Sequence, residues 1–230
     1  MFKSIRIACF ALTALVLAAP AFAVGPIDGE VGLVWWQTDF DRSTDIEDVS
    51  IDAGAPGFRG ELWFASKVGV RAETFSSDLG DLNEEDAEYL SADVMFRLFG
   101  VTDNNFLALG LGWSDMDFTE SGVLPVLVET SGPRATLEAR IGVASMVQIF
   151  GHYTLMPELD DYDNAAGDVF AELEGQEYQL GVAWKVAPFM DLRAGYRSQT
   201  LEFTRQMTTA TDYSGEVDST GFLLGLGFNF

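Results

Sequence analysis

Beyond residue 23, apolar and polar residues alternate along the chain with a period of two. The segment 221–230 has the pattern over its whole length, because every even position is large and apolar: Phe222, Leu224, Leu226, Phe228 and Phe230. Successive side chains of a β-strand point to opposite faces, so this alternation predicts a strand with one apolar face. The odd positions are mainly glycine, and we expect them to leave space for long side chains from the opposite side of an enclosed interior.

Nine earlier segments follow the same pattern. We therefore predict ten strands, at 28–39, 58–66, 68–76, 87–98, 104–117, 133–144, 147–156, 173–186, 189–203 and 216–230. Proline cannot donate a hydrogen bond to a strand ladder, and the prolines after residue 23 lie at the ends of these segments or between them. No run of 18 apolar residues follows residue 23, so the sequence predicts no transmembrane helix.

The connections between the predicted strands alternate between short and long. The long ones are 40–57, 77–86, 118–132, 157–172 and 204–215. Short turns at one end and long loops at the other are typical of an up-and-down antiparallel β-barrel in a membrane, and a sheet in lipid must close on itself. We predict an all-β transmembrane barrel of ten strands, with eight as the alternative. Aromatic residues near the strand ends are candidates for the membrane interface: Trp35, Trp36, Phe58, Trp113, Tyr153, Trp184 and Phe230.

The first 23 residues form a separate segment with the features of an export signal. Lys3 and Arg6 precede an apolar stretch from Ile7 to Ala18, and Ala21-Phe22-Ala23 provides small residues at a cleavage position. We therefore expect a cleaved signal peptide at 1–23 and a barrel domain at 24–230.

Composition and charge exclude several function classes. The chain has 36 acidic and 13 basic residues and a formal net charge of −23, which disfavours nucleic acid as a partner. Its single cysteine, Cys9, permits no intramolecular disulfide and no cysteine-based metal site. Its single histidine, His152, excludes a multi-histidine zinc site.

The alternating segments and the terminal strand ending in Phe230 resemble the small outer-membrane β-barrel proteins of Gram-negative bacteria, in the broad OmpX/OmpW/OmpA-barrel class. The resemblance implies a monomer in the outer membrane with both termini in the periplasm, in contact with membrane lipid and lipopolysaccharide. It also implies that the barrel-assembly machinery reads the terminal strand, through Phe222, Leu224, Leu226, Phe228 and Phe230.

Charged residues of both signs fall on the inward-facing side of the predicted strands. With the one histidine, the set comprises Glu30, Arg59, Glu61, Arg71, Glu73, Asp93, Arg97, Glu138, Arg140, His152, Glu177, Asp191, Arg193 and Arg197. Two interpretations are open: an ion-pair network that blocks the lumen, or a polar channel whose charges set ion selectivity. We favour the blocked lumen, because long arginine side chains in a narrow barrel meet carboxylates before they meet bulk water.

The predicted external loops are strongly acidic. Their carboxylates include Asp39, Asp41, Asp45, Glu47, Asp48, Asp52, Asp78, Asp81, Glu84, Glu85, Asp86, Glu158, Asp160, Asp161, Asp163 and Asp168, whereas Arg42 and Arg205 are their only basic residues. A solvated surface is one interpretation and a Ca²⁺ or Mg²⁺ site is the other. The metal candidates are Asp161, Asp163 and Glu172, although Ala165 and Ala166 stand where a calcium loop needs a ligand and a glycine. No other cofactor is expected.

Three functions follow in order of preference. The first is a non-enzymatic structural or surface-interaction protein with a blocked lumen, and the second is a narrow pore for ions or small solutes. The third is a lipid-modifying or proteolytic barrel enzyme, which would have to use His152. The apolar stretch 123–128 in the third loop is either a strand extension, a loop folded over the lumen or a contact patch for lipid or a partner.

Overall fold

A computed structural model describes residues 27–44, 48–80, 85–102, 105–120, 126–160, 162–163, 169–206 and 213–230 of the chain. Its strands are β1 (Ile27–Thr44), β2 (Asp48–Phe64), β3 (Val68–Gly80), β4 (Glu85–Thr102), β5 (Asn105–Glu120), β6 (Val126–Ala144), β7 (Val147–Met156), β8 (Tyr162–Asp163), β9 (Val169–Ala187), β10 (Met190–Gln206) and β11 (Tyr213–Asn229). Within these ranges there is no helix that could cross a membrane. The predicted signal peptide lies outside the described residues.

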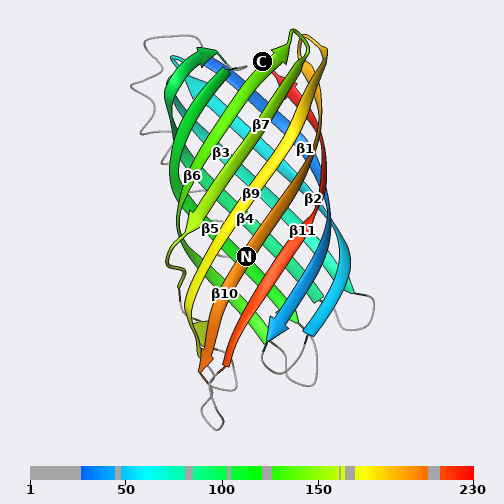
Figure 1. Cartoon of the computed structure of the whole chain (residues 1–230), viewed down its shortest axis with the longest axis vertical. Helices are drawn as coiled ribbons and strands as arrows, with labels where there is room; N and C mark the ends of the chain where they lie inside the picture. Colours follow the sequence, from blue (N-terminus) through cyan, green and yellow to red (C-terminus); the bar gives the residue numbers. More distant parts are fainter. Residues whose placement is uncertain are drawn as a thin grey trace.

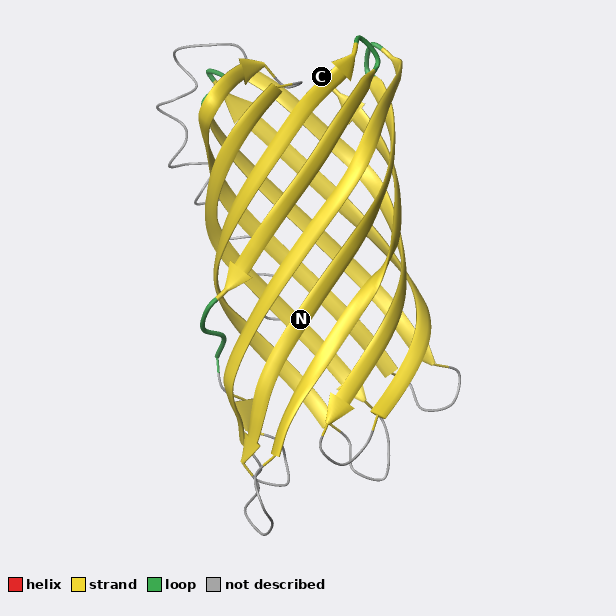
Figure 2. Ribbon diagram, viewed as in Figure 1, coloured by secondary structure: helices red, strands yellow, loops and turns green. Residues whose placement is uncertain are grey.

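Ten of the strands form one closed antiparallel barrel (Figures 1 and 2). Each pairs with the next along the chain, β7 pairs with β9, and β11 closes the ring on β1, where Leu33 lies opposite Leu226. The two-residue strand β8 pairs only with β9, at a level beyond the end of β7. The prediction of ten strands is confirmed, and the eight-strand alternative is wrong.

The tight turns all lie at one end of the barrel, the turn end, and the longer connections at the other, the loop end. Phe230 lies at the turn end, where its backbone and that of Gly29 exchange two hydrogen bonds of 3.0 Å (Figure 1). Gly100, near the β4–β5 turn, has a φ of 80°, and a Cβ there would come within 2.0 Å of the Asn105 carbonyl oxygen. This position therefore requires glycine.

The alternation places apolar side chains outside the barrel and polar ones inside. On β1, Val31, Leu33 and Trp35 face outward and are about half exposed, whereas Trp36 and Thr38 are buried inside. Trp36, predicted at the membrane interface, is therefore an interior residue. The register explains this correction: Trp36 directly follows the outward-facing Trp35, and adjacent residues of a strand point to opposite faces.

The strands extend beyond their predicted ends at the loop end. Most of the predicted loops 40–57 and 77–86 and half of 204–215 is strand, and Arg42 and Arg205 lie on β1 and β10 rather than in loops. The hydrogen-bonded ladders continue past the apolar band, where both faces are polar and the apolar alternation that marks a strand is lost. Of the apolar stretch 123–128, residues 126–128 belong to β6, which confirms a strand extension there; 123–125 lie outside the described residues.

Candidate functional site: the barrel interior

The interior changes character from the turn end to the loop end. Along β10, for example, the inward-facing side chains include Asp191, Arg193 and Arg197, followed by Gln199, Leu201 and Phe203. The same order, charged and then apolar, occurs on several strands. It divides the lumen into a turn-end mouth, a central ionic network and an apolar layer at the loop end.

Part of the ionic network is built on β2, β3, β4 and β6. Arg71 forms a 2.8 Å contact with Asp93 and a 2.7 Å contact with Glu138. Glu138 also accepts a 2.7 Å hydrogen bond from Arg140, which contacts Glu61 in turn. Because Arg71 and Glu138 come from β3 and β6, these contacts cross the lumen rather than run along its side.

Glu177 on β9 is the centre of the other part. Its carboxylate contacts His152 at 2.6 Å, accepts a hydrogen bond of 3.0 Å from the Tyr89 hydroxyl and one of 3.1 Å from Arg197. Arg197 also contacts Glu73 on β3. Arg134 joins the two parts, because it donates to the Tyr89 hydroxyl and its Nε lies 3.2 Å from Asp93.

This network is balanced in charge. Its five arginines and five carboxylates are Arg59, Arg71, Arg134, Arg140, Arg197, Glu61, Glu73, Asp93, Glu138 and Glu177, and all ten are buried. Removing an ion from water is costly unless a partner and hydrogen bonds replace the water. Equal numbers of opposite charges, each in contact with at least one other, meet that condition and fill the centre of the barrel.

Opposite charges that stand two residues apart on one strand pair with each other only in part. Arg59 contacts Glu61 at 3.2 Å, and Arg193 contacts Asp191 at 2.9 Å. Arg71, however, pairs with Asp93 and Glu138 rather than with Glu73, which is two residues away on its own strand. Residues two apart along a strand share a face, but contacts across the lumen also depend on the closure of the barrel.

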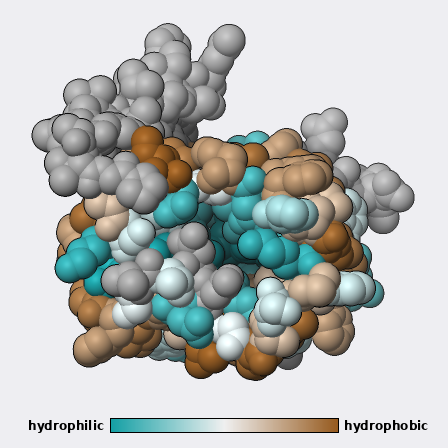
Figure 3. All heavy atoms as spheres, turned by 90° about the horizontal axis from the view of Figure 1, so that it is seen from above, coloured by the Kyte–Doolittle hydropathy of each residue, from teal (hydrophilic) through white to brown (hydrophobic). Residues whose placement is uncertain are grey.

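The turn-end mouth is a polar hollow of about 240 Å³. Figure 3 looks onto this end and shows hydrophilic residues around the opening. Arg193 contacts Glu30 and Asp191 here, and Asn229 donates a 2.8 Å hydrogen bond to Asp191. Lys185, also on this lining, is exposed.

Arg97 is held near the turn end between aromatic rings. Its guanidinium carbon lies 4.0 Å from the centre of the Trp63 ring and 4.5 Å from that of Phe106. It also donates a 3.4 Å hydrogen bond to the Ser66 carbonyl oxygen. Arg97 therefore lies in a largely aromatic environment. With it, all fourteen of the predicted charged and histidine residues lie inside the barrel.

The apolar layer at the loop end was not predicted. It consists of Trp36, Ala55, Phe75, Tyr89, Met116, Met156, Leu159, Leu173, Leu201, Phe203 and Leu223, all buried. The sequence could have shown this layer. Every second residue of a strand faces inward, and the inward positions of each strand run from its charged residues to these apolar side chains. The predicted set of interior residues contains neither Arg134 nor Tyr89, which joins Arg134 to Glu177.

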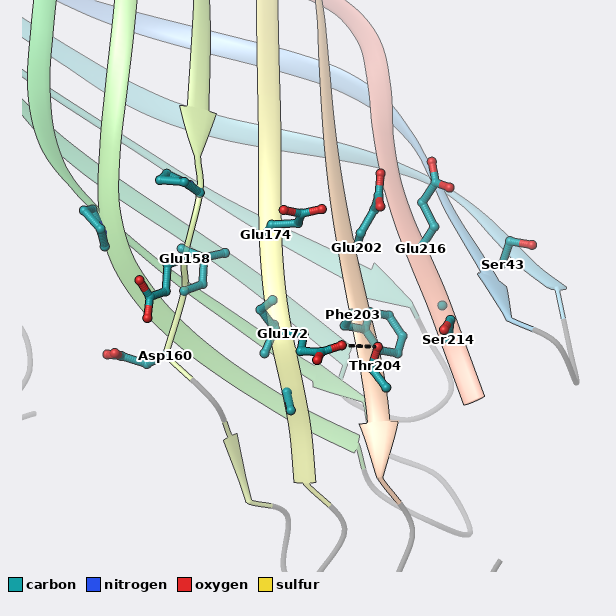
Figure 4. Close-up of a pocket in the computed structure, with 16 residues that line it drawn as sticks. Ser43, Glu158, Asp160, Glu172, Glu174, Glu202, Phe203, Thr204, Ser214 and Glu216 are labelled. Atoms are coloured by element: carbon teal, nitrogen blue, oxygen red, sulfur yellow. Dashed lines mark hydrogen bonds between the residues drawn. The ribbon is translucent and has the colours of Figure 1, made fainter. Parts of the chain in front are cut away.

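The outer surface at the loop end is acidic. Glu174, Glu202 and Glu216 lie opposite one another on β9, β10 and β11, in a groove of about 1150 Å³ (Figure 4). Burial and the nearby Asp218 carboxyl raise the pKa of Glu216 above its usual value. On β1, the hydrogen bond with Asp52 and the neighbouring negative charges raise the pKa of Asp39.

The candidate metal ligands are only partly visible. Asp161 and the side chain of Asp163 lie outside what the structure describes, and Glu172 accepts a 3.3 Å hydrogen bond from Thr204 (Figure 4). Among the described side chains, no group of three or more acidic, histidine or cysteine residues is arranged to hold a metal ion. The terminal-strand residues Phe222, Leu224, Leu226, Phe228 and Phe230 lie on the outward face of the barrel.

Solved structures share this fold. The outer membrane protease OmpT from Escherichia coli aligns over 89% of this chain and 96% of its own, with a TM-score of 0.61 and 10% sequence identity. An outer membrane channel from Pseudomonas putida F1 aligns over 90% and 96%, with a TM-score of 0.51 and 11% identity. No protein-family model and no curated protein sequence matches the chain. The fold is that of the outer-membrane β-barrels, as the sequence predicted.

Proposed function

We propose that this protein is a closed, non-enzymatic barrel of the Gram-negative outer membrane, with a structural or surface-interaction role. The observation that carries the proposal is the pair of successive barriers in its lumen. The balanced ionic network fills the centre, and the apolar layer follows it at the loop end. An ion would have to displace paired charges and then cross an apolar layer, and each step is unfavourable.

The membrane placement rests on the outer surface. Apolar side chains such as Leu111, Leu180 and Phe222 are about 60–70% exposed there, and burying so much apolar surface needs lipid. In the proposed orientation the turn end faces the periplasm, and the acidic loop end faces the medium. This assigns the interaction surface to the loop end.

The interior histidine supports a non-enzymatic role. His152 is 6% exposed and is bound to Glu177 inside the ionic network. A catalytic base must reach a substrate, and neither the turn-end mouth nor the loop-end groove is lined by His152 or Glu177. The protease and channel activities named for the two similar structures belong to those proteins.

Planar-bilayer recording of the protein purified from membranes tests the closed lumen. We expect no conductance steps. Two checks show that the protein is inserted and folded: it resists carbonate extraction from liposomes prepared in parallel, and it keeps the heat-dependent gel mobility of a folded barrel. Regular steps from such preparations would favour the narrow pore instead and would overturn the proposal.

A further inference from the structure

The barrel is not continuously hydrogen bonded between β2 and β3. Their pairing runs from the turn end only as far as Gly57 opposite Phe75. The β1–β2 pairing continues to Ser43 opposite Asp48, and the β3–β4 pairing continues to Gly80 opposite Glu85. Among the described residues, 48–56 and 76–80 therefore belong to separate hairpins, and we refer to this opening as the β2–β3 split.

Pro56 stands at the start of the split. It precedes Gly57 in the chain, is the next residue of β2 toward the loop end, and would lie opposite Ser76 in the register of the two strands. Proline has no N–H group to donate to a partner strand and is tolerated at strand edges. The sequence thus favours an end of the β2–β3 ladder at this residue.

A groove of about 650 Å³ lies on the outer surface where the split begins. Outward-facing apolar residues of β1, β2 and β11 form its sides, and the ends of the β2–β3 ladder form its floor. Its lining comprises Leu33, Val34, Trp35, Pro56, Gly57, Phe58, Thr74, Phe75, Ser76, Leu224, Gly225 and Leu226. Phe75, whose side chain belongs to the apolar layer inside the barrel, is also part of the groove lining.

We propose that this groove binds one acyl chain of an outer-membrane lipid. The inference rests on the proposed membrane placement, because the groove is continuous with the lipid-facing apolar surface. Trp35, Phe58 and Leu224 on its sides are 47–63% exposed and need an apolar neighbour. A lipid chain is the apolar molecule that a membrane supplies at this surface.

The polar features beside the groove agree with a lipid held at the edge of the hydrocarbon region. Unpaired strand edges are not tolerated against hydrocarbon, so the split must open where headgroups begin. The outward positions change there from Trp35 to Gln37 on β1 and to Ser76 on β3. Backbone groups of 54–56 that face the split have no partner strand there and can bond the lipid headgroup.

Quenching of Trp35 fluorescence tests the site. The probe is phosphatidylethanolamine with dibrominated acyl chains, added in detergent to a variant in which Trp36, Trp63, Trp113 and Trp184 are replaced by Phe. We expect quenching to saturate near one lipid per barrel. Ser76→Phe fills the groove and should raise the half-saturating concentration by about tenfold, equivalent to about 1.4 kcal/mol.

The matched control is Ala72→Phe, on the same outward face of β3 but outside the groove, which should leave the titration unchanged. Quenching that rises in proportion to brominated lipid without saturation, or equal effects of the two substitutions, would overturn the site. If the variant that keeps only Trp35 does not fold, native mass spectrometry replaces the fluorescence titration and uses the chain with all its tryptophans. One retained lipid in the Ala72→Phe protein and none in Ser76→Phe supports the site. Neither result depends on conductance, so the closed lumen and the lipid site can fail separately.

Discussion

The two halves of the lumen are stabilised in different ways by the same strands. In the centre, Arg197 is fully buried and contacts Glu73 and Glu177, with the rings of Trp36, Phe75 and Tyr89 within about 5 Å of its guanidinium. At the loop end, the side chains need only fill space. A buried ion pair depends on every partner, whereas an apolar layer depends mainly on volume. We therefore expect the centre to tolerate substitution less well than the loop end.

Arg197→Ala should have the largest effect on stability. It leaves Glu73 and Glu177 without one cation inside the barrel, and breaking a buried pair in this way costs about 3–5 kcal/mol. Urea unfolding in detergent, followed by tryptophan fluorescence, measures the loss. Lys185→Ala is the control, because this cation is exposed at the turn-end mouth and its removal should change the free energy of unfolding by less than about 0.5 kcal/mol. Equal losses in the two variants would show that the network does not stabilise the barrel.

Leu201→Ala in the apolar layer should have a smaller effect, of about 2–3 kcal/mol. The loss comes from the removed contacts and the cavity, and the loop end has room to relax around it. Leu201→Met conserves volume and should cost less than about 1.5 kcal/mol. The same urea titration compares these variants with Arg197→Lys, which keeps the charge but loses the forked geometry that reaches both carboxylates. A Leu201→Met variant less stable than Arg197→Lys would contradict the contrast between the halves.

The sequence predicted the features that depend on alternation alone. Strand number, the inward face and the charged residues of the network other than Arg134 follow from a period of two and from closure. It did not predict which charges meet across the lumen, such as Arg71 with Glu138, because the closed barrel rather than the strand sets those neighbours. It also failed where both faces are polar, so that strand residues 40–44 and 204–206 read as loop. The apolar layer was missed because apolar residues were assigned to lipid by type, although Trp36 follows outward-facing Trp35 in register.

Glu216→Gln should have the smallest effect and tests the outer surface of the loop end. Glu216 lies directly opposite Glu202, and its pKa is raised by burial and by Asp218. A carboxyl whose pKa is higher in the folded protein binds its proton more tightly there. The contribution of this carboxyl to stability is therefore complete below its pKa in the unfolded chain and is lost as the pH rises through its pKa in the folded protein.

Glu216→Gln should remove this loss and stabilise the barrel at pH 7 by less than about 0.5 kcal/mol, since the site is exposed. Urea midpoints at about pH 4 and pH 7 measure it. Glu88→Gln, an exposed carboxylate on β4, serves as the control. If Glu216→Gln changes both midpoints equally, titration of this carboxyl does not contribute, and the acidic surface acts only through its total charge.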